Sequence, residues 1–211
     1  MLFRSGRNLR RLTADAGNEG DPAWTPDGAQ IVYTFTRGTT TQIAIIPVDG
    51  GASRPLTTSS GGNHSPAVSP DGRSIAFVSA RDGNQEIYAM NLDGANQRRF
   101  SKTSERESSP RFFRNGDLAY VVERGGSSKG SRIMRLGWGG TSASPVLQTE
   151  NPVRAIAVSR EGDRLAYVVG RITDVTKGRV EFSFFLQSTA PGSPPVPVPL
   201  NPGEQILNPS F

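Results

Sequence analysis

The sequence predicts an all-β fold, a β-propeller of four-stranded antiparallel blades, of which about four to five are present. Three observations lead to this prediction. A motif recurs with a period of 44 residues, each copy places a tight-turn signal between short apolar runs, and no segment shows helical periodicity. The 211 residues include 24 Gly and 16 Pro, a composition typical of many short strands joined by turns.

The repeated motif is a short apolar segment followed by a turn. Its copies are Pro22–Gly28, Pro66–Gly72, Pro110–Gly116 and Ile156–Gly162. The first three copies are 44 residues apart, and the fourth follows after 46. The same 44-residue spacing separates Leu12–Thr13, Leu56–Thr57 and Phe100–Ser101. Because a four-stranded unit of this kind buries its faces only against neighbouring copies, the period predicts radially stacked blades.

Each unit is expected to contain four strands. The first ends at a dipeptide that tolerates the positive φ angles of tight hairpins: Asp27–Gly28, Asp71–Gly72 or Asn115–Gly116. Second strands are expected at Ile31–Tyr33, Ile75–Val78, Leu118–Val121 and Leu165–Val168. Third strands are expected at Ile43–Val48, Ile87–Leu92, Ile133–Trp138 and Phe184–Gln187. A short edge strand completes each unit.

The chain is expected to form a single domain over residues 1–211, with units at about 14–57, 58–101, 102–148 and 149–207. Segments 1–13 and 208–211 look like the end and the start of a unit, so we expect them to complete one shared blade. A small closed ring and part of a longer propeller are both open as alternatives. The proline-rich segment Ala190–Gly203 cannot form an inner strand and is expected to connect stiffly to the last strand.

Charge and composition exclude several classes of function. The net charge is +5, but no aromatic platform is interleaved with the basic residues, so no nucleic-acid partner is expected. The absence of cysteine excludes disulfides and thiol catalysis. No apolar run approaches the ~20 residues of a membrane-spanning helix, and residues 1–7 lack the apolar core of a signal peptide. We therefore expect no transmembrane segment in this chain, and any export signal or anchor to lie outside it.

Few residues are candidates for chemistry. The sequence contains no nucleophile elbow, phosphate-binding loop or metal-spaced histidine cluster, so we predict no catalytic residue, no metal site and no cofactor. His64 is the only histidine and precedes the expected first strand of the second unit, where it is a candidate contact for a ligand or partner. Trp24 and Trp138 are expected to be packing residues.

Arg111 is the second candidate contact. In the other units its position holds an alanine: Ala23, Ala67 and Ala157. Because an unpaired buried charge is costly, a long cationic side chain on an innermost strand must reach the channel or a buried acid. We hypothesise that Arg111 lines the axial channel of the propeller.

The second unit resembles the repeat of the TolB-like propeller family. The residues that carry the resemblance are Ser65–Ser79, which read Ser-Pro-Ala-Val-Ser-Pro-Asp-Gly-Arg-Ser-Ile-Ala-Phe-Val-Ser, followed by Glu86–Gly94. The resemblance extends over roughly residues 8–170. In the third and fourth units the Pro-Asp-Gly turn becomes Arg114–Gly116 and Arg160–Gly162, which weakens the transfer of function but not that of the fold.

The resemblance, which is of the Tol–Pal type, implies a non-enzymatic scaffold or accessory subunit of a bacterial cell-envelope assembly. It implies a periplasmic or envelope location and a protein partner that is membrane-associated or a lipoprotein. Two alternatives are open: the propeller part of a prolyl-oligopeptidase-like peptidase, and a propeller that binds a small ligand or sugar. A hydrolase domain, or several His and Arg residues converging on the channel, would favour an enzyme, and this sequence has neither.

Overall fold

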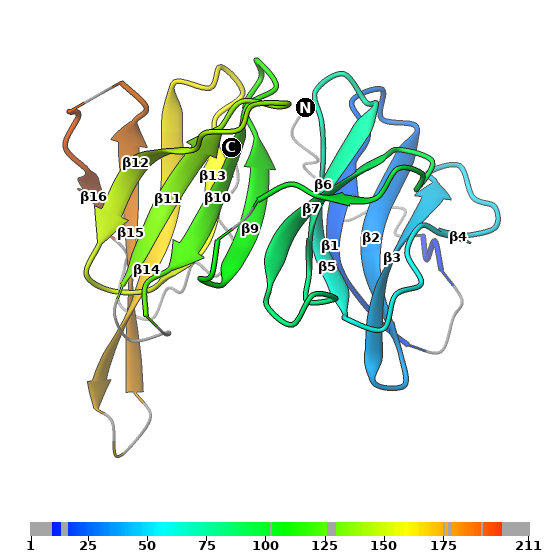
Figure 1. The fold of residues 1–211 in the computed structure, drawn as a ribbon, viewed down its shortest axis with the longest axis horizontal. Helices are drawn as coiled ribbons and strands as arrows, with labels where there is room; N and C mark the ends of the chain where they lie inside the picture. Colours follow the sequence, from blue (N-terminus) through cyan, green and yellow to red (C-terminus); the bar gives the residue numbers. More distant parts are fainter. Residues whose placement is uncertain are drawn as a thin grey trace.

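The computed structural model describes residues 10–13, 17–101, 103–125, 130–174, 176, 179–190 and 192–199. They form four antiparallel sheets of four strands each, arranged as a four-bladed β-propeller (Figure 1). No helix occurs among these residues. The all-β propeller predicted from the repeat is therefore confirmed.

Strands that follow one another in the chain are neighbours in each sheet. The first sheet contains β1 (Asn18–Trp24), β2 (Gln30–Arg37), β3 (Thr40–Pro47) and β4 (Arg54–Pro55). The second contains β5 (Asn63–Val68), β6 (Ser74–Ser79), β7 (Glu86–Asn91) and β8 (Arg98–Arg99). The third contains β9 (Glu107–Phe112), β10 (Leu118–Glu123), β11 (Ser131–Leu136) and β12 (Ser144–Thr149). The fourth contains β13 (Val153–Val158), β14 (Arg164–Asp174), β15 (Arg179–Ser188) and β16 (Val196–Val198).

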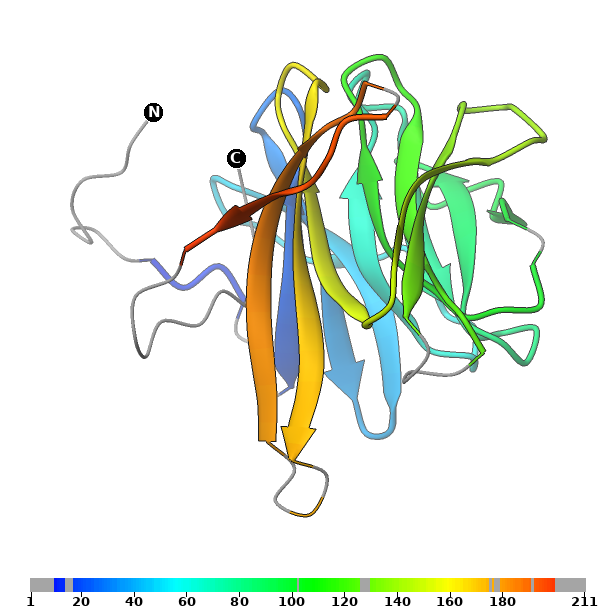
Figure 2. The same cartoon turned by 90° about the vertical axis from the view of Figure 1, so that its left-hand side faces the viewer.

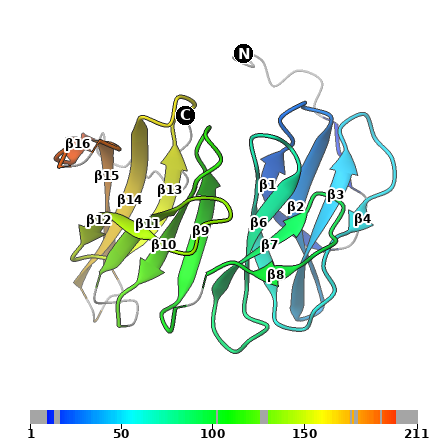
Figure 3. The ribbon, with the colours of Figure 1, turned by 45° about the horizontal axis from the view of Figure 1, so that its top comes forward.

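The first strands of neighbouring sheets lie beside one another. β1 contacts β5, β5 contacts β9, and β9 contacts β13. β4 and β16 lie at opposite outer margins of the molecule (Figure 3). The extensive contacts between described strands of different sheets all join consecutive sheets. Side chains on β1, β5 and β9 are thereby brought to one place, although they lie far apart in the sequence.

The core consists of apolar layers between consecutive sheets. Each layer takes fully buried side chains from both of its sheets: Val32, Ile43, Ile75 and Phe77 in the first layer, Val78, Ile87 and Leu118 in the second, and Ile133, Ile156 and Leu165 in the third. Except for Ile156 on β13, these residues come from the apolar second and third strands of the repeat. Burial on both faces explains why those strands read as continuous apolar runs.

Asp-Gly turns follow the first strands at the predicted positions. Oδ1 of Asp71 accepts hydrogen bonds from the hydroxyl of Ser69 at 2.5 Å and from the backbone N–H of Arg73 at 3.1 Å. Asp27 receives the equivalent pair in the first sheet. These hydrogen bonds, the hydroxyl bond first, hold the pKa of both carboxyls below the ordinary value. Gly72 has a φ of 70°, which an L side chain rarely adopts.

The fourth sheet departs from the expected unit. β14 and β15 form a long hairpin that extends beyond the other strands (Figure 2), so the expected strand at Phe184–Gln187 is only part of β15. β16 lies within Ala190–Gly203 and pairs with β15 at the edge of the sheet, where the missing N–H of proline is tolerated. The expected shared blade involves residues 1–13 and 208–211, of which 1–9 and 208–211 lie outside the described residues.

Candidate binding site between the first three blades

The first strand of each of the first three sheets has a bulge before its proline. Asp21, Ser65 and Ser109 have φ angles of 47°, 52° and 54°, and each directly precedes a proline. The pairing of β1, β5 and β9 with their neighbours shifts register at these places. Non-glycine residues with positive φ are strained by about 1–3 kcal/mol each, and such strain is concentrated at functional sites. β13 contains no proline.

Asp21 connects the first two bulges. Its Oδ2 accepts hydrogen bonds from the backbone N–H of Ser65 at 3.1 Å, from the Ser65 hydroxyl at 3.4 Å and from the hydroxyl of Thr34 at 3.3 Å. The carboxylate therefore links β1 to β5 and orients both strained segments. Sequence reasoning missed this residue. The available signal was its register, since Asp21, Ser65 and Ser109 are 44 residues apart and all precede proline.

A cavity of about 580 Å³ lies between these three strands. Its lining includes Asp21, Trp24, Ser65, Ala67, Arg111 and Phe112. This volume is within the range of ~300–1,000 Å³ that is typical of small-molecule sites. The walls combine one carboxylate, one guanidinium and aromatic surface, so the cavity can offer both charge and stacking to a ligand.

Arg111 lines this cavity. Its strand, β9, pairs with β10 in the register that the repeat predicts. The Cα of Arg111 is opposite that of Ala119, just as Ala67 is opposite Ala76 in the second sheet. Nη1 of Arg111 donates a hydrogen bond to the carbonyl oxygen of Pro110 at 2.8 Å. Burial lowers the pKa of Arg111, and the negative charge of Asp21 opposes this shift.

His64 lies within β5, opposite Val78, and not before the strand as expected. It is half-buried, and it is not among the residues that line the cavity. Nδ1 lies 3.1 Å from the Ser65 hydroxyl, and Nε2 lies 3.4 Å from the Gln85 side-chain nitrogen. Burial lowers the pKa of His64, Asp21 raises it and Arg106 lowers it. The imidazole is therefore neutral at neutral pH.

The contacts of Ser65 are not those of a catalytic triad. Its hydroxyl lies near both His64 and Asp21. In a Ser–His–Asp triad the carboxylate bonds to the histidine and orients it, whereas here the carboxylate bonds to the serine. Within the part of the chain that the structure describes, no group of three or more His, Asp or Glu side chains could hold a metal ion.

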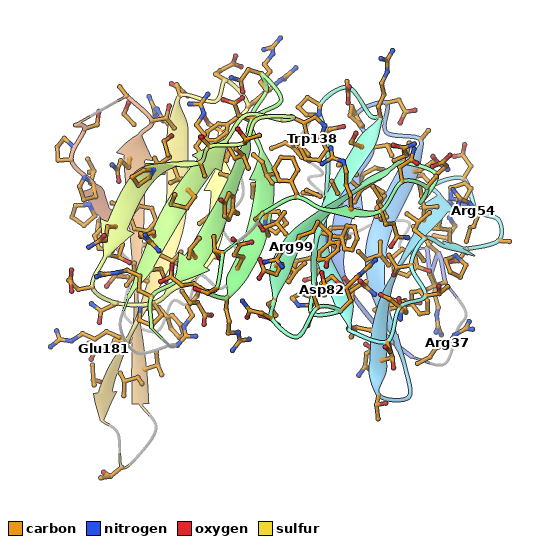
Figure 4. All side chains as sticks on the ribbon, viewed as in Figure 1. Arg37, Arg54, Asp82, Arg99, Trp138 and Glu181 are labelled. Carbon is orange, nitrogen blue, oxygen red and sulfur yellow. The ribbon has the colours of Figure 1, made fainter. Side chains whose placement is uncertain are left out.

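The two tryptophans differ in their surroundings. Trp138 stacks on Phe100 with ring centroids 4.6 Å apart and meets Phe112 edge-on at 4.8 Å, which agrees with a packing role. It lies between the second and third sheets (Figure 4). Trp24 is 55% exposed and lines the cavity. The expectation that Trp24 is a packing residue is therefore wrong, because more than half of its surface is exposed.

Comparison with solved structures supports the propeller fold. TolB from Acinetobacter baumannii superposes with a TM-score of 0.73 and 24% identity, over 88% of this chain and 44% of that one. A protein from Agrobacterium tumefaciens described as TolB gives 0.71 and 21%, over 86% of this chain and 64% of that one. The chain thus spans less than two thirds of the length of either structure, and at these identities the likeness shows the fold alone.

No helix among the described residues is long and apolar enough to span a membrane.

Sequence comparison gives two further matches. A Streptomyces coelicolor protein named as a tricorn protease homolog is 43% identical over 44 residues, which is 21% of this chain and 4% of that protein. The family model described as the TolB beta propeller domain matches residues 2–110 and 57–183. Since these matches cover most of the sequence, the chain belongs to the TolB beta propeller domain family.

Proposed function

We propose that this chain is a non-enzymatic propeller that binds a protein partner at the cavity between β1, β5 and β9. It would act as a scaffold or accessory subunit of a bacterial cell-envelope assembly, with a membrane-associated protein or lipoprotein as partner. Membership of the TolB propeller family supports the periplasmic or envelope location. The chain spans only part of the length of its solved relatives. The role of the whole protein is therefore proposed here together with the binding site.

The observation that supports this proposal most strongly is the strained backbone around the cavity. Asp21, Ser65 and Ser109 keep positive φ angles at equivalent positions of three blades, and two of these residues line the cavity. A fold retains such strain when the resulting geometry is useful, and a rigid scaffold with shaped surfaces is a good platform for binding. Arg111 is the proposed partner contact in this cavity. His64 is a proposed contact next to it, through Ser65.

The test is affinity capture of the tagged chain from native envelope extract, followed by mass spectrometry. Arg111→Glu reverses the charge inside the cavity. Arg160→Glu is the matched control, because Arg160 is exposed in the turn between β13 and β14 and does not line the cavity. We expect a stoichiometric membrane protein or lipoprotein with wild type and with the control, and its loss with Arg111→Glu. Capture that is unaffected by Arg111→Glu, or no partner at all, would contradict the proposal.

A second candidate is the propeller part of a peptidase, or a propeller that binds a small ligand or sugar. The local match to a protein named as a tricorn protease homolog favours the peptidase alternative, although it covers one repeat only. The two functions differ in their partner. A small ligand that shifts the unfolding midpoint of the chain, with no protein captured, would favour the second candidate.

A further inference from the structure

We propose that Arg111 binds a carboxylate in the cavity between β1, β5 and β9. This inference rests on the proposed function, namely that the cavity is a binding site, and it specifies the chemical group that is bound there.

The first support is that Arg111 lacks the ion pair that three other half-buried arginines form. Arg99 pairs with Glu86 at 2.6 Å, Arg135 pairs with Asp117 at 2.7 Å, and Arg132 pairs with Glu105. These three therefore have a carboxylate partner within the protein. Among the described residues Arg111 forms no ion pair, and its one hydrogen bond is to the carbonyl oxygen of Pro110.

The second support is the position of the one anion nearby. Asp21 lines the same cavity but lies on β1, and its Oδ2 already accepts three hydrogen bonds from Ser65 and Thr34. Burial lowers the pKa of Arg111 and the charge of Asp21 opposes this shift, but no ion pair joins the two side chains among the described residues. The guanidinium consequently retains unpaired donors in a fixed planar array, which matches the two oxygens of a carboxylate.

The other walls indicate what the rest of the ligand meets. Ala23 and Ala67 occupy little space on the neighbouring strands, Trp24 exposes an aromatic face, and Asp21 can accept a hydrogen bond from a donor group. A carboxylate at Arg111 would therefore be followed by a short apolar or hydroxylated chain. Two sources of this chemistry fit: an acidic side chain of a partner protein, and a free small carboxylic acid.

The test uses NMR spectra of the ¹⁵N-labelled full chain, in which two tryptophans give two indole N–H signals. Trp24 lines the cavity, whereas Trp138 is packed between Phe100 and Phe112 and serves as an internal control. The probes are glutarate and its neutral analogue glutaramide, and an amidated peptide with one glutamate and its glutamine counterpart. We expect the Trp24 signal to shift with the carboxylate probes only.

The variants separate binding from folding. Arg111→Gln should weaken carboxylate binding about tenfold or more, since hydrogen bonds to a charged group are lost. Arg111→Lys should retain part of the binding, and Arg160→Gln should leave it unchanged. The dispersion of the backbone signals shows whether each variant is folded. If Arg111→Gln does not fold, the comparison is made with Arg111→Lys.

Both sources of the carboxylate are distinguished by affinity. Tighter binding of the glutamate peptide than of glutarate indicates a partner's side chain, and the reverse indicates a free acid. The proposal is overturned if Trp24 does not respond to any carboxylate, or if folded Arg111→Gln binds as wild type does. If no carboxylate binds but a partner is still captured from envelope extract, the proposed function stands and only the carboxylate proposal fails. If carboxylates bind but no partner is captured, only the proposed function is contradicted.

Discussion

Asp21 and Ser65 occupy equivalent positions in consecutive blades, and they bond to each other: Oδ2 of Asp21 accepts the backbone N–H of Ser65 at 3.1 Å, across 44 residues of sequence. Both residues have positive φ and both precede a proline. The repeat thus produces a direct contact between two of its own copies. That contact lies on the wall of the cavity, so the period of the sequence and the geometry of the candidate site are connected through one carboxylate.

Replacing Asp21 should separate its structural role from its charge. Asn retains an acceptor oxygen and tolerates positive φ, so Asp21→Asn should have nearly wild-type stability. Asp21→Ala loses the hydrogen bonds to Ser65 and Thr34 and should lower the free energy of unfolding by about 1 kcal/mol or more. Urea unfolding measures both variants. Equal stability of the alanine and asparagine variants would contradict the proposed link between β1 and β5.

Ser109 tests the strain in the third bulge. With a φ of 54°, the residue should accept glycine but not a β-branched side chain. We expect Ser109→Val to be less stable than Ser109→Gly by about 1–2 kcal/mol. Chemical denaturation of the two variants provides the comparison. If valine were as stable as glycine, the left-handed backbone at this position would not persist in solution.

The junction between the second and third sheets contains two buried carboxyls where the preceding junction has amides. Nδ2 of Asn63 donates to Oε1 of Gln42 at 2.9 Å, and the residues 44 positions later are Glu107 and Glu86. Glu107 accepts hydrogen bonds at 3.0 Å from the backbone N–H of Ile87 and also from the side chains of Ser101 and Thr103. Burial raises the pKa of Glu107, these hydrogen bonds oppose the shift, and the charge of Glu86 adds to it.

This raised pKa predicts how stability depends on pH. A carboxyl whose pKa is higher in the folded state than in the unfolded state contributes stability at low pH, and this contribution is lost as the pH rises above the ordinary value of 4.5 through the raised value. Glu107→Gln removes the ionisation and retains a polar group of the same shape. Its unfolding midpoint should exceed that of wild type at pH 8, with a smaller difference at pH 4. Thermal melts at the two pH values test this, and a gain confined to pH 4 would show that the sign is wrong.

Phe113 tests the layer between the third and fourth sheets. It is 2% exposed and packs in the cluster that contains Ile156 and Tyr167. Phe113→Ala should lower the free energy of unfolding by about 3–5 kcal/mol, because it removes buried apolar surface and leaves a cavity. Differential scanning calorimetry would show the loss. A cost below about 1 kcal/mol would mean that the two sheets do not pack together in solution.

The repeat predicted the strands well because its spacing fixes the register of the sheets. The position of Arg111 illustrates this, since a 44-residue offset was enough to identify it with Ala67, and both lie opposite an alanine in the next strand. The length of the β14–β15 hairpin was not predicted. Gly170–Asp174 continues β14 beyond the expected strand, and no turn signal in this segment marks where the strand ends.

The candidate site was harder to predict than the fold. Asp21 was missed because its role depends on a contact with Ser65 in the next blade, which no local pattern encodes. His64 was placed before the strand, but the bulge at Ser65 lets β5 begin one residue earlier than His64. Trp24 was expected to be a packing residue, and its exposure depends on how the sheets assemble, which no local pattern encodes.

The most direct test of partner binding at the cavity is photocrosslinking in cells from a benzoylphenylalanine placed at Trp24. Ile172 provides the control position, because it is similarly exposed at 51% but lies on β14, away from the cavity. The proposed function predicts one major crosslinked envelope protein from position 24, lost in the Arg111→Glu background, and none from position 172. Crosslinks from position 172 alone, or none from position 24, would contradict the cavity as the binding site.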